Sequence, residues 1–215
     1  MTLPGGDNMA FLPVLIEMEG MPCLVAGGGA IAFHKAEKLL AHGADVTVVS
    51  PEICTEISAL PVKVLKRCAE ASDCEGMSLV ADATGDRGAE ELLSKACAEL
   101  HIPYICAGNG DLCTAILPAV YSRGRTVVAV SSKGASPAAS AWLRDLLADK
   151  VPENMDALLD RMADVRALAK ECLDSQPVRR EFMHSCLKKM TDTGEVISDK
   201  EIKEILKWYS GENGK

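Results

Sequence analysis

The sequence has no apolar run that approaches about 18 residues, the shortest length typical of a transmembrane helix, so we expect no membrane span. Its N-terminus lacks a basic segment ahead of its apolar residues, which argues against a secretory signal peptide. The nine cysteines are odd in number and form no C-x-x-C pair, a pattern that favours reduced thiols in a cytoplasmic protein. The four histidines have no ligand-like spacing to these cysteines, so we predict no metal site.

Basic residues are outnumbered as well. The 23 Lys+Arg against 31 Asp+Glu give a formal net charge of −8, which argues against nucleic acid or an anionic membrane as a general partner. Hydrophobic residues make up 48% and charged residues 25%, an ordinary globular mixture. Residues 1–113 carry a net charge of −9, residues 114–150 carry +3 and residues 151–215 carry −2. The middle segment is therefore the only basic part of the chain.

The first part of the chain alternates strand and helix signals. Short apolar or β-branched runs predict strands over 21–26, 45–49, 62–65, 78–83 and 103–107. Helical spacing of apolar residues predicts helices over 31–42 and 88–100. This alternation predicts an α/β fold, a parallel sheet with helices on both faces.

A different pattern follows. Residues 115–120 and 126–131 predict two strands, separated by Tyr121–Arg125. A helix over 138–147 comes next, with Ser136 as its N-cap and Pro137 at its first position.

From Glu153 onward the pattern is helical, and Ser198 with Glu201 predicts a capping box for a last helix that ends near Trp208. We therefore predict three domains: a dinucleotide-binding domain over 1–113, a dimerisation segment over 114–150 and a helical domain over 151–215.

Glycines follow the first predicted strand. Gly27, Gly28, Gly29, Ala30 and Ile31 begin a G-x-G-x-x-A motif between that strand and the first helix. Small residues let the backbone turn tightly and approach a pyrophosphate, to which the helix N-terminus presents unpaired N–H groups. The alternative is a tight turn without a ligand.

Two further loops stand at expected carboxyl ends of strands. An NAD site usually has an acid after the second strand, to bind the ribose hydroxyls. This chain has Ser50, Pro51 and Glu52 there. It has no Arg that could hold a 2′-phosphate, and this absence favours NAD over NADP. After the fourth strand, Thr84 and Gly85 are placed to contact the coenzyme, whereas Asp86 has the alternative role of capping the next helix.

The basic segment contains a polar loop. Ser131, Ser132 and Lys133 precede the predicted helix start, a combination suited to a multiply anionic ligand. A polar loop without a ligand is the alternative.

Several motifs in order resemble precorrin-2 dehydrogenases, the dehydrogenase and ferrochelatase part of sirohaem synthases. They are FLPVLIEMEGMPCLVAGGGAIAFHKAEKLLAHGADVTVVSPE, VADATGD, ICAGNGDLCTAILPAV and TVVAVSSKGASPAASAWLRDLL. The resemblance implies a homodimer with a Rossmann-like domain, a dimerisation segment and a small helical domain. It also implies oxidation of precorrin-2 to sirohydrochlorin with NAD⁺, and in some members insertion of Fe²⁺.

Site residues follow from the same resemblance. The coenzyme positions include Gly27, Gly29, Ala30, Ile31, Pro51, Glu52 and Thr84. Ser132 matches a serine near the family's active site. Carboxylates of the substrate suit Ser131, Lys133, Arg144, Arg123 and Arg125 as partners.

The chain departs from the family at its catalytic aspartate, whose position holds Gly108 beside Asn109 in the expected substrate site. Asp111 lies three residues further on and can substitute only if the turn is rebuilt. Three hypotheses remain: a dehydrogenase, a dehydrogenase that is also a ferrochelatase, and a binding module without turnover.

Overall fold

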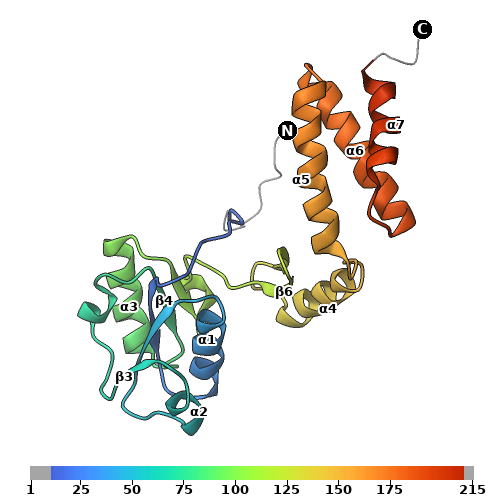
Figure 1. Ribbon diagram of the computed structural model, residues 1–215. Coiled ribbons are helices and arrows are strands. Elements are labelled where there is room, and N and C mark those ends of the chain that lie inside the picture. The colour runs from blue at the N-terminus through green and yellow to red at the C-terminus, as the bar shows by residue number, and fades with distance from the viewer. Residues whose placement is uncertain (1–10, 211–215) are drawn as a thin grey trace. The chain divides into compact units, whose positions relative to one another are not determined.

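The computed structural model describes residues 11–210 and divides the chain into two compact units (Figure 1). The first unit runs to Leu117 and includes Ser131–Ser136. The second unit comprises Pro118–Val130 and the chain from Pro137 onward. The basic middle segment is therefore shared between the two units.

The first unit is built on a five-stranded parallel sheet, as the alternating pattern predicted. Its strands are β1 (Pro22–Ala26), β2 (Asp45–Val49), β3 (Lys63–Leu65), β4 (Leu79–Asp82) and β5 (Tyr104–Cys106). They lie in the order β3-β2-β1-β4-β5, and all neighbours are parallel. The chain leaves β1 toward β2 on one side and returns to β4 on the other. The switch point, where open α/β sheets bind ligands, is therefore at the carboxyl ends of β1 and β4.

Helices cover both faces of this sheet. Helix α1 (Ala30–Leu40) lies on one face and α3 (Arg87–Leu100) on the other, with the short α2 (Thr55–Ser58) beside α1 (Figure 1). Each main helix contributes apolar residues to its own buried cluster: Ala32, Ala36 and Leu39 from α1, and Leu93, Ala96 and Cys97 from α3. Two 3-10 turns, η1 (Ala71–Cys74) and η2 (Gly110–Leu112), complete the unit. The unit is Rossmann-like, as expected.

The second unit begins with a two-stranded antiparallel hairpin, and here the sequence prediction was partly wrong. The strands are β6 (Ala119–Arg123) and β7 (Thr126–Val130), so Tyr121–Arg123 belong to a strand and not to the connection. The predicted strand over 115–120 starts too early, because the Thr114 and Ala115 amides donate to the Tyr104 carbonyl of β5. Pro118, which has no amide hydrogen, separates that connection from β6.

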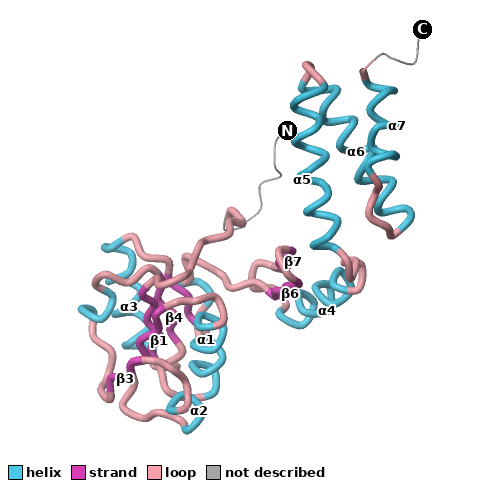
Figure 2. The backbone as a smooth tube through the Cα atoms, in the orientation of Figure 1, coloured by secondary structure: helices cyan, strands magenta, loops and turns pink. Residues whose placement is uncertain are grey.

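Helices make up the rest of the second unit. Helix α4 (Pro137–Ala148) packs on the hairpin, and α5 (Met155–Cys172), α6 (Gln176–Thr193) and α7 (Asp199–Tyr209) follow (Figure 2). The last three share a core that includes Leu158, Val165, Phe182, Met190 and Ile202. The predicted capping box is confirmed, since the Glu201 amide donates to the Ser198 hydroxyl and the Ser198 amide donates to the Glu201 carboxylate.

Within residues 11–210, none of the helices combines the length and apolar composition needed to cross a membrane.

Candidate functional site

The turn between β1 and α1 is held by contacts that only glycine permits. Gly27 has a φ of +115°, and a Cβ there would lie 2.5 Å from the Ala83 carbonyl oxygen. A Cβ on Gly28 would lie 1.8 Å from the Glu52 carbonyl oxygen. At Gly29, by contrast, no atom comes within 4 Å of the added Cβ. The turn is therefore closed toward the protein and open at Gly29.

The structure brings the predicted coenzyme residues together around this turn. The Cys54 amide donates to the Gly28 carbonyl at 2.8 Å and holds the segment after β2 against the turn. The Ser50 hydroxyl oxygen would be 2.9 Å from a Cβ on Gly28. The loop after β4 abuts the same turn, since the Thr84 amide nitrogen would be 3.1 Å from a Cβ on Gly27. Three loops that are distant in sequence thus form one rim.

The N-terminus of α1 opens onto this rim. Gly29 is the N-cap residue, and no side chain caps the helix. The first amides of an uncapped helix lack partners and attract anions. Ile31 has 57% of its surface exposed, so it belongs to the rim and not to the core. These features fit the diphosphate of a dinucleotide.

The loop after β4 is fixed by a buried carboxylate. Asp82 is 1% exposed, and its Oδ1 accepts hydrogen bonds from the Thr84 amide at 2.9 Å and the Thr84 hydroxyl at 2.7 Å. Its Oδ2 accepts from the Tyr104 hydroxyl at 2.8 Å. Burial and this hydrogen bond raise the pKa of Tyr104. Thr84 thus orders the loop. Asp86 caps α3 by accepting a hydrogen bond from the Ala89 amide at 2.8 Å, which is the capping role predicted as its alternative.

A pocket of about 630 Å³ lies beside this loop. It is lined by Gly85, Arg87, Glu90, Glu91, Gly108, Asn109 and Leu112. Gly85 follows β4 and Gly108 follows β5, so the pocket is at the carboxyl edge of the sheet. The predicted substrate residues Gly108 and Asn109 therefore belong to one pocket, next to the loop that contacts Gly27.

One carboxylate in this pocket is buried. Glu90 is 7% exposed, and a Cβ on Gly108 would lie 2.3 Å from its Oε1. Burial mainly, and the Glu90 carboxylate in addition, raise the pKa of the Cys106 thiol. Asp111, the predicted substitute base, is exposed on η2 and does not line the pocket, and its amide donates to the Asn109 Oδ1 at 3.1 Å.

The serines of the predicted anion-binding loop have structural partners. The Ser132 hydroxyl accepts from the Ser136 amide at 2.9 Å and donates to the Ser136 carbonyl at 3.0 Å, which closes the turn before α4. The Ser131 hydroxyl accepts from the Lys133 amide at 3.1 Å. Lys133 is exposed, with a φ of +54°. Both hydroxyls therefore shape the loop that presents Lys133.

The arginines predicted as carboxylate partners, unlike Lys133, already contact other side chains of the chain. Arg125 pairs with Asp160 at 2.6 Å, and Arg144 pairs with Asp145 at 2.6 Å. Arg123 lies 5.8 Å from the centre of the Tyr121 ring. Within residues 11–210, Lys133 is the one of these four cations that has neither an ion pair nor a ring contact.

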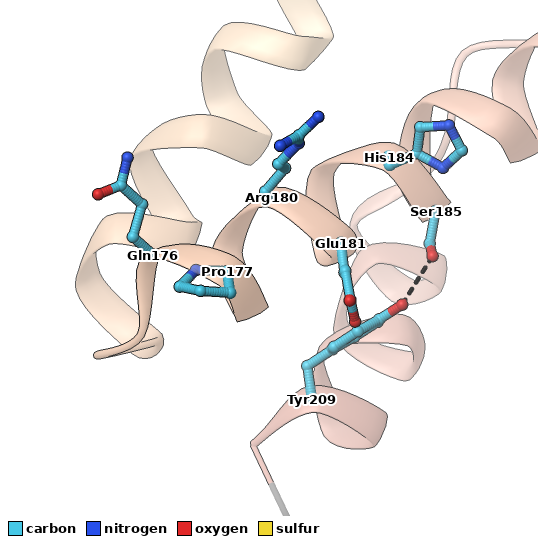
Figure 3. Close-up of a pocket in the computed structure, with 7 residues that line it drawn as sticks. All are labelled: Gln176, Pro177, Arg180, Glu181, His184, Ser185 and Tyr209. Carbon is cyan, nitrogen blue, oxygen red and sulfur yellow. Dashed lines mark hydrogen bonds between the residues drawn. The ribbon is translucent and has the colours of Figure 1, made fainter.

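The helical unit has an open pocket of about 690 Å³ between α6 and α7 (Figure 3). It is lined by Gln176, Pro177, Arg180, Glu181, His184, Ser185 and Tyr209. The Ser185 and Tyr209 hydroxyls are hydrogen-bonded at 2.8 Å, and most of the other lining residues are exposed. Neither this pocket nor any other place within the described residues gathers three potential metal ligands.

Sequence reasoning missed Asp82, Tyr104 and Glu90. Asp82 was assigned only as part of a strand, although a carboxylate inside a buried apolar run is a signal of a fixed polar network. Glu90 gave no such signal, because acids are common in the first turns of helices. Its burial depends on Gly108, which is adjacent only in the folded chain.

Comparisons with known proteins agree with this geometry. The family described as "Putative NAD(P)-binding" matches residues 14–119, which include the whole sheet and the glycine turn. Siroheme synthase of Methylococcus capsulatus is 32% identical over 183 residues, which are 83% of this chain and 39% of that protein. Siroheme synthase of Nitrosospira multiformis is 35% identical over 188 residues, 83% of this chain and 40% of that protein. The chain thus spans about two fifths of the length of the curated relatives it matches.

A solved structure shares the fold. The chain named "SirC, precorrin-2 dehydrogenase" has a TM-score of 0.63 and 22% identity, over 94% of this chain and 100% of that chain. Similarity at this level of identity concerns the fold alone. It extends beyond the Rossmann-like unit into the helices.

Proposed function

We propose that the chain is a precorrin-2 dehydrogenase, which catalyses the NAD-dependent oxidation of precorrin-2 to sirohydrochlorin; its similarity to siroheme synthases and its NAD(P)-binding match support this. The observation that carries the proposal is the glycine turn, which is closed toward the protein and open at Gly29, at the uncapped N-terminus of α1. Its position at the switch point of the sheet is where a dinucleotide binds in this class of fold.

The coenzyme is held by the three loops around the turn. The first amides of α1 and the backbone of Gly28 and Gly29 hold the diphosphate, and exposed Glu52 faces the ribose hydroxyls. A carboxylate at that place repels a 2′-phosphate, which supports NAD over NADP. When bound, the nicotinamide accepts a hydride from the substrate.

The protein's own contribution is to position the substrate and exclude water. The pocket at Gly85 and Gly108 adjoins the coenzyme turn through the β4 loop, so it is the place for the part of the ring that is oxidised. Positioning two reactants in one site supplies a large part of the rate enhancement in such transfers. Ser131, Ser132, Lys133 and Arg144 stay the proposed contacts of the substrate carboxylates, with Lys133 the most available cation.

We also propose that the chain forms a homodimer through the hairpin and α4. An isolated two-stranded hairpin is marginally stable in water, and its edges are open to pairing. Helix α4 exposes four large apolar side chains, Trp142, Leu143, Leu146 and Leu147. A patch of this kind is typical of a protein interface.

We place the reaction in the cytoplasm, where thiols stay reduced. All nine cysteines are free, including Cys74 and Cys97, whose sulfur atoms are 3.7 Å apart.

The proposed activity is tested by incubating the purified protein anaerobically with precorrin-2 and NAD⁺. We expect the absorption spectrum of sirohydrochlorin to develop together with NADH, and NADP⁺ to support a slower reaction. Tight coenzyme binding without product would favour the binding module instead. Faster metal insertion into sirohydrochlorin than without protein would add the ferrochelatase activity.

A further inference from the structure

We propose that Glu90 is the general base of this oxidation, the group that takes the proton the substrate loses. This inference rests on the proposed function and names a residue for one of its steps. The observation behind it is a buried carboxylate that lines the pocket at the carboxyl edge of the sheet.

Burial of Glu90 is unusual for its type. Glutamate is rarely buried unless it is paired, yet within residues 11–210 its carboxylate forms no ion pair. The carboxylate is close enough to the Cys106 thiol to help raise the pKa of that thiol. Arg87 also lines the pocket but pairs with Glu91, so Glu90 is a buried pocket carboxylate without an ion pair among the described residues, which is typical of a functional site.

Gly108 makes room for this carboxylate. The Oε1 of Glu90 lies 2.3 Å from the place of a Cβ on Gly108, so a side chain at that position would displace the carboxylate. The glycine therefore lets the α3 carboxylate reach over the end of β5. The pocket also contains Gly85, so its walls at the ends of β4 and β5 are backbone.

The groups around Glu90 leave it as the best placed base in the pocket. Glu91 is its neighbour on α3, but that carboxylate is 51% exposed and pairs with Arg87 at 3.1 Å. From β5, Cys106 faces the carboxylate of Glu90, and Tyr104 donates to the Glu90 main-chain carbonyl at 3.2 Å and to Asp82 of β4. Asp82 itself is fully used in hydrogen bonds within its own loop and with Tyr104.

The step balances as a two-electron oxidation. One C–H bond of the substrate breaks and its electron pair leaves with the hydrogen, so that NAD⁺ is reduced to NADH. A second bond to hydrogen breaks, its electron pair stays in the ring system and completes the new double bond, and the proton goes to a Glu90 carboxylate oxygen. The neutral acid then returns the proton to solvent through the pocket.

The test compares Glu90→Gln with Glu99→Gln in the full chain. Glu90→Gln keeps the shape of the side chain and removes its basicity, so we expect kcat to fall by about 10²–10⁴-fold while KM for precorrin-2 and the Kd for NAD⁺ stay unchanged. The acid limb of the pH profile of kcat is also expected to disappear. Glu99→Gln, at an exposed carboxylate on α3 outside the pocket lining, should retain the kcat and the pH profile of the parent chain. Gly108→Ala, which pushes the carboxylate out of its place, should lower kcat without weakening NAD⁺ binding.

The outcomes separate this inference from the proposed function. If the parent chain binds NAD⁺ but makes no sirohydrochlorin, the proposed function fails and this inference fails with it. If the parent chain is active and Glu90→Gln keeps its kcat and acid limb, only the role of Glu90 is overturned. A loss of NAD⁺ binding or of folding in Glu90→Gln, with full activity in Gly108→Ala, would also overturn it and leave Glu90 a structural residue.

Discussion

The three glycines of the turn between β1 and α1 have different roles, although the sequence motif treats them alike. Gly27 and Gly28 are required by the fold, because a Cβ at either position would meet the backbone of a neighbouring loop. Gly29 has no such neighbour, so its lack of a side chain serves the ligand and not the fold. Substitutions can separate these two tasks.

Gly29→Ala should fold normally and bind NAD⁺ at least about tenfold more weakly, a loss of about 1.4 kcal/mol. The added methyl group meets no protein atom but stands where the diphosphate approaches α1. Thermal unfolding and calorimetric titration with NAD⁺ measure the two properties. Gly110→Ala, which also meets no atom within 4 Å, is the control and should keep the parent affinity. Equal affinities for both variants would contradict this account of the turn.

Glu90, the proposed base, is the residue of the site that sequence reasoning did not predict. Motifs identified the turn, Ser50–Glu52 and the β4 loop, because each follows a strand that the apolar pattern already placed. The same reasoning found Gly108 where the family has an aspartate, and so predicted a missing carboxylate. The folded chain has the Glu90 carboxylate next to that glycine, a proximity between residues 18 positions apart that no local pattern encodes.

At the scale of elements, local signals predicted the long helices and most strands but missed the short α2. Ser198 and Glu201 predicted the start of α7 because a capping box is formed by residues three positions apart. The start of β6 was misplaced because it depends on pairing: Thr114 and Ala115 bind to β5, and Arg123 pairs with Thr126 across a two-residue turn. Local sequence does not specify such partners.

The hairpin turn should be sensitive to a methyl group. Gly124 has a φ of +53°, and its Cβ would lie 1.7 Å from Oδ2 of Asp156. Gly124→Ala should lower the free energy of unfolding by more than the about 1–3 kcal/mol that backbone strain alone costs. Gly134→Ala has the same kind of strain at φ +87° but open space around it, so it is the matched control. Chemical denaturation compares them, and equal losses would contradict the contact with Asp156.

The cap of α7 should make stability depend on pH. Hydrogen bonds from Lys189 and then Ser198 lower the pKa of Glu201 from 4.5 to about 2. Because the folded-state pKa is below the unfolded one, the stabilisation is complete above pH 4.5 and is lost as the pH falls toward 2.

Glu201→Gln should therefore be less stable than the parent chain at neutral pH, and the difference should shrink over that interval. Urea unfolding followed by circular dichroism measures it. Glu195→Gln, at an exposed carboxylate before α7, is the control and should show no comparable trend.

For the whole molecule, the alternating first part predicted the Rossmann-like unit, and the helical stripe predicted the core of α5 to α7. The order of the strands came from the structure, since the apolar runs by themselves allow other orders. Assembly belongs to this scale too, because the hairpin and α4 expose apolar side chains that one chain leaves uncovered.

We expect a molar mass near twice the 22.8 kDa of one chain in light scattering. Leu146→Glu, at a residue that is 46% exposed on α4, should shift the protein toward the monomer because it places a charge in the proposed interface. Leu187→Glu, at a residue 36% exposed on α6, is the control and should remain dimeric. A monomeric parent chain at micromolar concentration would contradict the proposed interface.

The central claim is that this chain passes a hydride from precorrin-2 to a dinucleotide bound at the glycine turn. The most direct measurement quantifies NADH and sirohydrochlorin in the same anaerobic reaction, with the parent chain and with Gly29→Ala. The account predicts equal amounts of the two products from the parent chain and a higher requirement for NAD⁺ in the variant. Sirohydrochlorin that forms without NADH, or no faster than in the absence of protein, would contradict it.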